Sequence, residues 1–162
     1  SNYDGIALIE IGLYRTGFHV VLGNGVIYVR EFPIGGERLT EIISDLGNLS
    51  LGEAEERKIN GDWSNDPILQ QAHLRFTDEI GEQALSALEV YLPNNPQVEL
   101  RRIFVTGGSA NIPGLVSALS EKFNEELVGL NPLDYVDFSD QVMKKSPASL
   151  SIACGLAIRS LD

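Results

Sequence analysis

The chain has 162 residues, of which 43% are hydrophobic and 22% are charged, values typical of one soluble globular domain with its own core. No apolar run approaches the ~20 residues that span a bilayer, so we expect no direct membrane insertion. The net charge of −11 repels DNA, RNA and anionic lipid headgroups, which argues against nucleic acid as a partner.

Three runs rich in β-branched residues open the chain, at residues 6–11, 18–22 and 26–32. The segments between them are short and contain glycine. Asn24-Gly25 is typical of a type I′ hairpin turn, because both central residues of that turn need positive φ. The pattern predicts an antiparallel meander of three strands.

Three helices are predicted after the three strands. Apolar residues recur every three or four positions from Leu39 to Leu46, which predicts a helix with Gly47 as its C-cap. A second helix is predicted over 51–58, capped by Ser50. A third, long helix is predicted from a cap at Asp66 to the "PNNP" segment that stops it.

A buried strand is predicted over 102–106, followed by the Gly107-Gly108 turn and a helix that starts at Pro113 and takes Asn111 as its cap. A short strand is expected near 126–130. A last helix is expected at the C-terminal end, with Ser146 as its cap. This order predicts an α/β fold in one domain, residues 1–162, with a mixed five-stranded sheet flanked by helices and a helical insertion about 48–92.

Gly107 and Gly108 lie between the strand and the helix in "IFVTGGSANIPGL". Glycine removes the Cβ atom, so a flat ligand can approach the main chain and its N–H donors. Ser109 offers a hydroxyl to the same ligand. The alternative is a plain corner that needs positive φ, and the pattern alone leaves both interpretations open.

Five segments resemble, in the same order, the PilM family of type IV pilus assembly proteins, which belongs to the actin-like ATPase superfamily. These segments are "FPIGGERLTEIIS", "LSLGEAEERK", "IFVTGGSANIPGL", "NPLDYV" and "SLSIACGLAIRSLD". The resemblance covers essentially the whole chain and implies the ribonuclease H-like second half of the actin-like ATPase fold. It also implies that another half precedes this one.

The resemblance implies a scaffold of type IV pilus biogenesis that binds ATP and Mg²⁺ between two halves, this chain supplying the adenosine side. The implied partners are inner-membrane pilus proteins, through a PilN-like cytoplasmic tail, and the pilus motor ATPases. The implied location is cytoplasmic, peripheral to the bacterial inner membrane. Catalysis is at most a weak ATPase activity, and the isolated chain is expected to be inactive because phosphate transfer needs both halves.

The implied nucleotide site has three parts. In "EIGLYRTG", Gly12 and Thr16 would meet phosphates, and Glu10 stands where the family has an aspartate that holds a metal-bound water. In "AEERK", Glu55 would accept from ribose hydroxyls and Lys58 would cover the purine. The third part, which would carry the adenosine, is formed by Gly107, Gly108 and Ser109.

Structural alternatives stand beside these roles. Glu10 can be a partly buried, paired acid at a turn, and Glu55 and Lys58 can be members of an exposed charged helix. No cysteine or second histidine lies at metal-ligand spacing from His19 or His73, which argues against a zinc site. Cys154 lies among small apolar residues and is expected in the hydrophobic core. Trp63 is expected to pack under the helical insertion.

Three other functions remain open. An actin-like filament or FtsA-type division protein would self-associate with rising concentration. A sugar kinase would need a catalytic carboxylate and a sugar pocket, which the sequence does not reveal. A nucleotide-independent docking module of a type II secretion or mannose-sensitive pilus machine would keep its glycine turns for structure alone.

Overall fold

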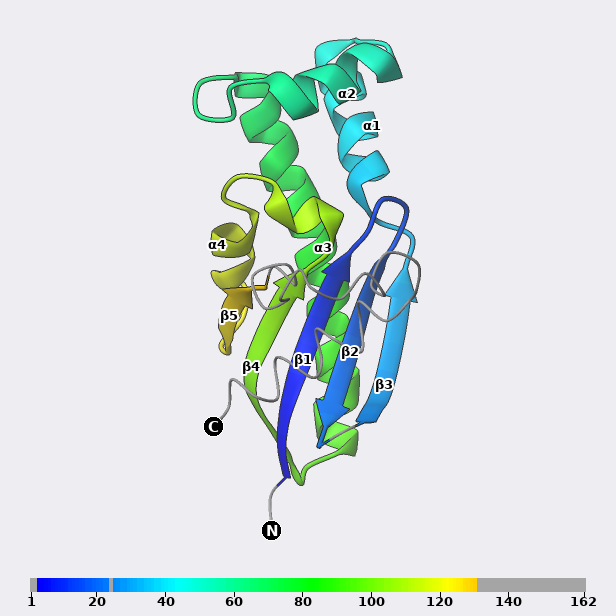
Figure 1. The fold of residues 1–162 in the computed structure, drawn as a ribbon, viewed down its shortest axis with the longest axis vertical. Helices are drawn as coiled ribbons and strands as arrows, with labels where there is room; N and C mark the ends of the chain where they lie inside the picture. The colour runs from blue at the N-terminus through cyan, green and yellow to red at the C-terminus, as the bar shows by residue number, and fades with distance from the viewer. Residues whose placement is uncertain (1–2, 24, 131–162) are drawn as a thin grey trace, which may run out of the picture.

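A computed structural model describes residues 3–23 and 25–130 of the protein. A five-stranded sheet forms its lower part, with strand order β3-β2-β1-β4-β5 (Figure 1). The strands are β1 Tyr3–Ile11, β2 Thr16–Leu22, β3 Gly25–Phe32, β4 Val98–Thr106 and β5 Glu126–Gly129. The segment "NPLDYV" and the expected C-terminal helix lie outside the described residues.

The sheet is mixed, as predicted. β1, β2 and β3 pair antiparallel, and Leu22 lies opposite Gly25, so the predicted short connection is confirmed. The prediction that Gly25 takes a central, positive-φ position of the turn is wrong, because Gly25 already pairs in β3 and Gly23 is the glycine with positive φ, at 55°. Asn24 itself lies outside the described residues. β4 pairs parallel to β1 and to β5. Each parallel pair needs a crossover, and helices lie between the paired strands along the chain.

Three helices link β3 to β4: α1 Gly36–Gly47, α2 Leu51–Asn60 and α3 Pro67–Asn94. The predicted caps are confirmed at Ser50, which forms a reciprocal capping box with Glu53, and at Asp66. The predicted C-cap at Gly47 is wrong by one residue. Asn48 takes the left-handed conformation, at φ 50°, which asparagine tolerates better than other non-glycine residues.

The segment after β4 also differs from the prediction. Residues Gly108–Asn111 form a 3₁₀ turn, and α4 begins at Leu115 and ends at Ser120. Asn111 therefore does not cap a helix that starts at Pro113. Gly114, at φ 76°, turns the chain into α4, and no side chain caps that helix. The expected strand near 126–130 is confirmed as β5.

The 28 residues of α3 connect the two parts of the molecule. Its first half packs against α1, which in turn packs against α2, and its second half lies behind the sheet (Figure 1). There the Tyr91 ring lies 4.9 Å from the Tyr28 ring of β3. The helical insertion expected about 48–92 thus includes a helix whose second half covers the sheet.

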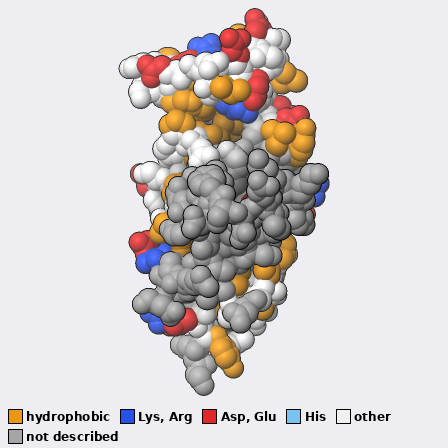
Figure 2. All heavy atoms as spheres, in the orientation of Figure 1, with side chains coloured by type: hydrophobic (Ala, Val, Ile, Leu, Met, Phe, Trp, Pro, Cys, Tyr) orange, Lys and Arg blue, Asp and Glu red, His pale blue; other side chains and the backbone are white. Residues whose placement is uncertain are grey.

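A single hydrophobic core runs along α3. Its buried side chains come from the sheet and from α1, α2 and α3. Acidic side chains, with basic ones among them, lie along the upper end of the molecule, where α2 is (Figure 2). Among the described residues, no helix is both long enough and apolar enough to cross a membrane.

Candidate functional site

The β1–β2 hairpin and the glycine loop after β4 meet at one edge of the sheet. β1 and β4 are adjacent and parallel, and Glu10 lies opposite Thr106, so the segments that follow both strands emerge together. The Ser109 hydroxyl donates to the Gly12 carbonyl oxygen across 3.1 Å. The structure thus brings together two of the three segments predicted to hold nucleotide.

The first turn of α1 lies against the same hairpin. The Gly36 N–H group donates to the Gly12 carbonyl oxygen at 2.9 Å, and the Glu37 N–H group donates to that of Leu13 at 2.8 Å. A Cβ atom on Gly36 would collide with the Ser109 hydroxyl. A larger residue at position 36 would therefore displace the Ser109 hydroxyl from its contact with Gly12.

Lys58 connects α2 to this turn. Its ammonium group donates to the Gly36 carbonyl oxygen at 3.1 Å and to the Thr40 hydroxyl at 2.9 Å, and lies 2.7 Å from a Glu55 carboxylate oxygen. The Thr40 hydroxyl in turn donates to Glu55 across 2.5 Å. Burial opposes ionisation of Glu55, but the hydrogen bonds from Lys58 and Thr40 outweigh it and lower the pKa of its carboxyl.

All three predicted segments are therefore linked by hydrogen bonds. We call this set the polar chain; its members are Gly12, Gly36, Thr40, Glu55, Lys58 and Ser109. The Lys58 side chain is only 13% exposed, whereas Glu55 is 44% exposed. Lys58 is held inside the chain of contacts, and Glu55 presents its carboxylate partly to solvent.

The structure explains why residue 107 is glycine but not why residue 108 is. Gly107 has φ 101°, and a Cβ atom there would collide with the backbone of Ile11, so the fold itself requires glycine. Gly108 is exposed, its φ is not positive, and a Cβ atom there would meet nothing within 4 Å. The corner explains Gly107, whereas nothing in the described fold explains Gly108.

The tip of the β1–β2 hairpin is less polar than the predicted phosphate role suggests. Leu13 and Tyr14 are 52% and 62% exposed there. The Thr16 hydroxyl is fully buried and donates to the Ile34 carbonyl oxygen at 2.6 Å. Thr16 thus stabilises the connection between β3 and α1 in this structure.

Glu10 lies at the end of β1 with its side chain 35% exposed. Burial, and then the nearby negative charge of Glu31, raise the pKa of its carboxyl. No group of three or more metal-ligating side chains occurs in the described part of the chain. A lone carboxylate nevertheless fits Mg²⁺, which keeps several waters and binds through one or two carboxylates together with phosphates.

Comparison with known proteins identifies the family. The family model for "Type IV pilus assembly protein PilM" matches residues 1–161. The chain belongs to the PilM family. The predicted resemblance is thus confirmed over essentially the whole sequence.

Solved structures confirm the actin-like ATPase fold. A PilM–PilN type IV pilus biogenesis complex matches at TM-score 0.64 and 23% identity, over 98% of this chain and 46% of the other. The ethanolamine utilization protein EutJ from Carboxydothermus hydrogenoformans matches at TM-score 0.61 and 22% identity, over 76% and 43%. MreB5 of Spiroplasma citri bound to ADP matches at TM-score 0.64 and 14% identity, over 99% and 54%. The chain therefore spans about half the length of these relatives.

Two residues of the polar chain, Gly36 and Thr40, were not predicted as site residues in this member of the PilM family. The signal for Gly36 lies in the sequence, since a second glycine directly before a helix needs a reason beyond the turn. Thr40 lies one helical turn after Gly36, and its hydroxyl also reaches the Gly36 carbonyl oxygen at 3.3 Å. Its role depends on the packing of α2 against α1, which the pattern of α1 alone does not show.

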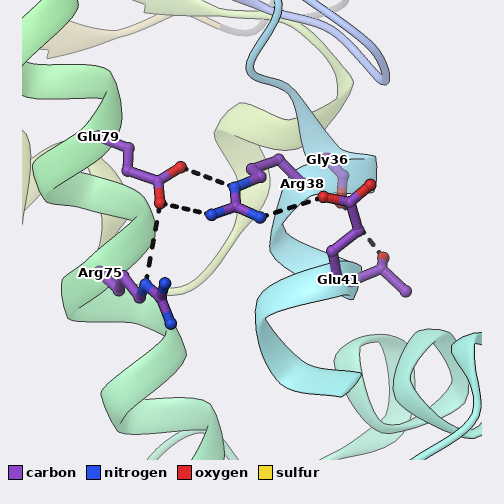
Figure 3. A network of polar contacts seen from close by, with 6 residues as sticks. Gly36, Arg38, Glu41, Arg75 and Glu79 are labelled. Atoms are coloured by element: carbon purple, nitrogen blue, oxygen red, sulfur yellow. Dashed lines mark hydrogen bonds and ion pairs between the residues drawn. The ribbon is translucent and has the colours of Figure 1, made fainter. Parts of the chain in front are cut away.

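Arg38 fixes the first turn of α1. Its Nε and Nη2 atoms donate to the two carboxylate oxygens of Glu79 on α3, each across 2.9 Å (Figure 3). Glu41 accepts from the Nη1 atom of the same guanidinium at 3.2 Å. This bidentate contact holds α1, and with it Gly36, against the central helix.

Proposed function

We propose that this PilM-family protein binds ATP with Mg²⁺ between two halves, and that this chain supplies the adenosine side. Gly108 would lie under the adenosine, Glu55 would accept from the ribose hydroxyls, and Glu10 would hold a magnesium-bound water. Mg²⁺ would offset the charge of the phosphates. Any ATP hydrolysis is slow, because phosphate transfer needs donors from both halves.

The observation that carries this proposal is the exposed, unobstructed Gly108 beside the polar chain. The described fold requires glycine at 107 but not at 108. A flat ligand that lies on the main chain would explain why residue 108 is glycine, because any side chain there would block the ligand. Glu55 belongs to the same connected set of contacts, and its carboxylate is partly exposed to such a ligand, whereas the ammonium group of Lys58 is engaged inside the set.

The nucleotide serves assembly in this proposal rather than metabolism. The protein acts in the cytoplasm as a scaffold beside the inner membrane, couples inner-membrane pilus proteins to the pilus motor ATPases, and engages a PilN-like cytoplasmic tail. The solved PilM–PilN complex supports this partner class by family likeness. Nucleotide between the halves would set their relative orientation, and so the readiness of the scaffold for its partners.

The single tryptophan of the chain provides a direct test. The Trp63 indole N–H group donates to the Lys58 carbonyl oxygen at 3.2 Å, so Trp63 reports on the end of α2. Titration of Mg-ATP into the natural protein that carries this chain should change Trp63 emission along a saturable curve. Mg-ATP should also displace a fluorescent ATP analogue. If neither signal appears at millimolar nucleotide, the proposed ATP site is wrong.

The hairpin tip favours a second candidate, a nucleotide-independent docking module. Leu13 and Tyr14 expose apolar surface where phosphate donors were expected, and Thr16 is engaged elsewhere. In this function the glycines serve structure alone and a partner protein covers the tip. Binding of a PilN-like peptide with the same affinity in the presence and absence of ATP would favour it.

A further inference from the structure

Three residues on neighbouring strands form a row beside the predicted metal-binding carboxylate. Glu10 of β1 lies opposite Gly17 of β2, and Gly17 lies opposite Glu31 of β3. The middle residue has no side chain. His19, two positions along β2, is on the same face of the sheet and fills this space.

The packing of the imidazole on Gly17 is close. A Cβ atom on Gly17 would lie 2.5 Å from the Nε2 atom of His19. The ring is therefore able to take its position only because residue 17 is glycine. The result is a buried imidazole that lies between two carboxylate-bearing strands.

His19 lacks a hydrogen-bond partner in the described structure. It is 5% exposed, and neither of its ring nitrogens makes a hydrogen bond. Buried polar atoms in proteins are almost always paired, so this imidazole needs an acceptor. Its Nε2 atom lies 3.8 Å from a carboxylate oxygen of Glu10, and a small rotation of that half-buried side chain would close the gap.

The charges around His19 favour Glu10 over Glu31 as the acceptor. Arg15 lies 3.4 Å from the Glu31 carboxylate and partly neutralises it. Glu10 has no arginine or lysine partner among the described residues. A neutral imidazole has one N–H group to donate, and the Glu10 carboxylate is the acceptor near Nε2.

We infer that His19 is a positioning residue that donates from Nε2 to Glu10 and fixes the direction of its carboxylate. This inference rests on the proposed function, in which Glu10 holds a magnesium-bound water. Glutamate has one more rotatable bond than the aspartate of the family pattern, so its carboxylate needs an additional contact to hold one direction. Gly17 and His19 together supply that contact.

A first experiment tests the pairing without nucleotide. Histidine ring nitrogens are observed by ¹⁵N nuclear magnetic resonance in the wild-type chain, in Glu10→Gln and in Glu31→Gln. We expect His19 to be protonated at Nε2, and its signals to move in Glu10→Gln and to change little in Glu31→Gln. Protonation at Nδ1, or no response to Glu10→Gln, would overturn it.

A second experiment tests the role in metal binding. ATP affinity of the natural protein is measured with Mg²⁺ and with EDTA, in the wild type, His19→Leu, Glu10→Gln and the double variant. Contacts that orient a ligand to a metal typically contribute about 10- to 100-fold in metal affinity, and we expect a loss of that order for His19→Leu in Mg²⁺. Affinity in EDTA should not change. In the Glu10→Gln background, His19→Leu should cause no further loss of ATP affinity, because His19 acts through Glu10.

Two variants sharpen the comparison. Gly17→Ala displaces the imidazole and should reproduce His19→Leu, while His19→Gln keeps an amide donor and should restore part of the affinity. Equal losses in Mg²⁺ and EDTA, or losses that add to that of Glu10→Gln, would overturn the positioning role. If the wild type binds no ATP under either condition, the proposed function fails and the metal role with it. The resonance experiment still decides whether His19 pairs with Glu10.

Discussion

The ammonium group of Lys58 donates a hydrogen bond to the main-chain carbonyl oxygen of Gly36 across 3.1 Å. This contact joins α2 to the first turn of α1, whose Gly36 N–H group in turn donates to the Gly12 carbonyl oxygen of the β1–β2 hairpin. Ser109 reaches the same Gly12 oxygen from the glycine loop. Lys58 therefore connects the helical part of the molecule to both loops of the predicted nucleotide site.

Lys58→Met should destabilise the protein and weaken ATP binding. The methionine keeps most of the aliphatic stem but leaves the Gly36 carbonyl oxygen and Glu55 without their cation, which should cost about 1–3 kcal/mol in unfolding free energy. Urea unfolding measures this change. Lys122→Met is the control, because Lys122 pairs with Asp78 at a more exposed site and should cost less than about 1 kcal/mol. Equal losses for the two variants would contradict the role of Lys58.

Gly107→Ala should destabilise the protein, whereas Gly108→Ala should leave its stability almost unchanged. Alanine at 107 is forced to a positive φ and collides with Ile11, which should cost about 2 kcal/mol or more. Alanine at 108 meets nothing and should change the unfolding free energy by less than about 0.5 kcal/mol. Thermal unfolding of the two variants under the same conditions measures the difference. Similar midpoints would show that the two glycines are not separated in this way.

Arg38→Lys should loosen α1 from α3. Lysine keeps the charge but cannot donate to both oxygens of Glu79 at once, so we expect a loss of about 1 kcal/mol. Arg75→Lys is the matched control, since Arg75 contacts the same carboxylate at 3.9 Å from a more exposed position. Hydrogen exchange should show faster opening of α1 in Arg38→Lys alone. Unchanged exchange in α1 would contradict this role.

Stability should fall as the pH falls below the ordinary pKa of histidine. Burial lowers the pKa of His73, opposed by a hydrogen bond with the main chain of Pro113. Below pH 6.5 the unfolded chain therefore binds a proton that the folded chain does not, and acid favours unfolding. The difference in unfolding free energy between the wild type and His73→Gln should shrink as the pH falls from 7.5 to about 5. Parallel curves would assign the pH dependence to other groups.

Much of the fold was predictable because its signals are local. The strands β1 to β3 and the caps Ser50 and Asp66 depend on alternation and on turn or capping residues within a few positions. The start of α4 was not predicted, because Asn111 serves equally well at the end of a 3₁₀ turn and as a helix cap, and Pro113 serves equally well in a turn and at the first position of a helix. The end of α1 was missed by one residue, since Gly47 and Asn48 both tolerate the left-handed conformation.

The sequence pointed to most residues of the candidate site, but not to Gly36 and Thr40 and not to the contacts between its segments. Gly107 and Gly108 look alike in the sequence, and only the approach of Ile11 separates them. The burial of the Thr16 hydroxyl depends on Ile34, and the space that His19 occupies depends on Gly17. These are contacts between different segments, which periodicity and motif spacing do not encode.

The most direct test of the account is calorimetric titration of Mg-ATP into the natural protein, compared with Gly108→Val and Gly52→Val. A Cβ atom meets nothing within 4 Å at either glycine, so both variants should fold, and Gly52 on α2 serves as the control. We expect saturable heat for the wild type and Gly52→Val, and its loss for Gly108→Val. Binding that survives Gly108→Val unchanged would contradict the role of Gly108 as the surface on which the adenosine lies.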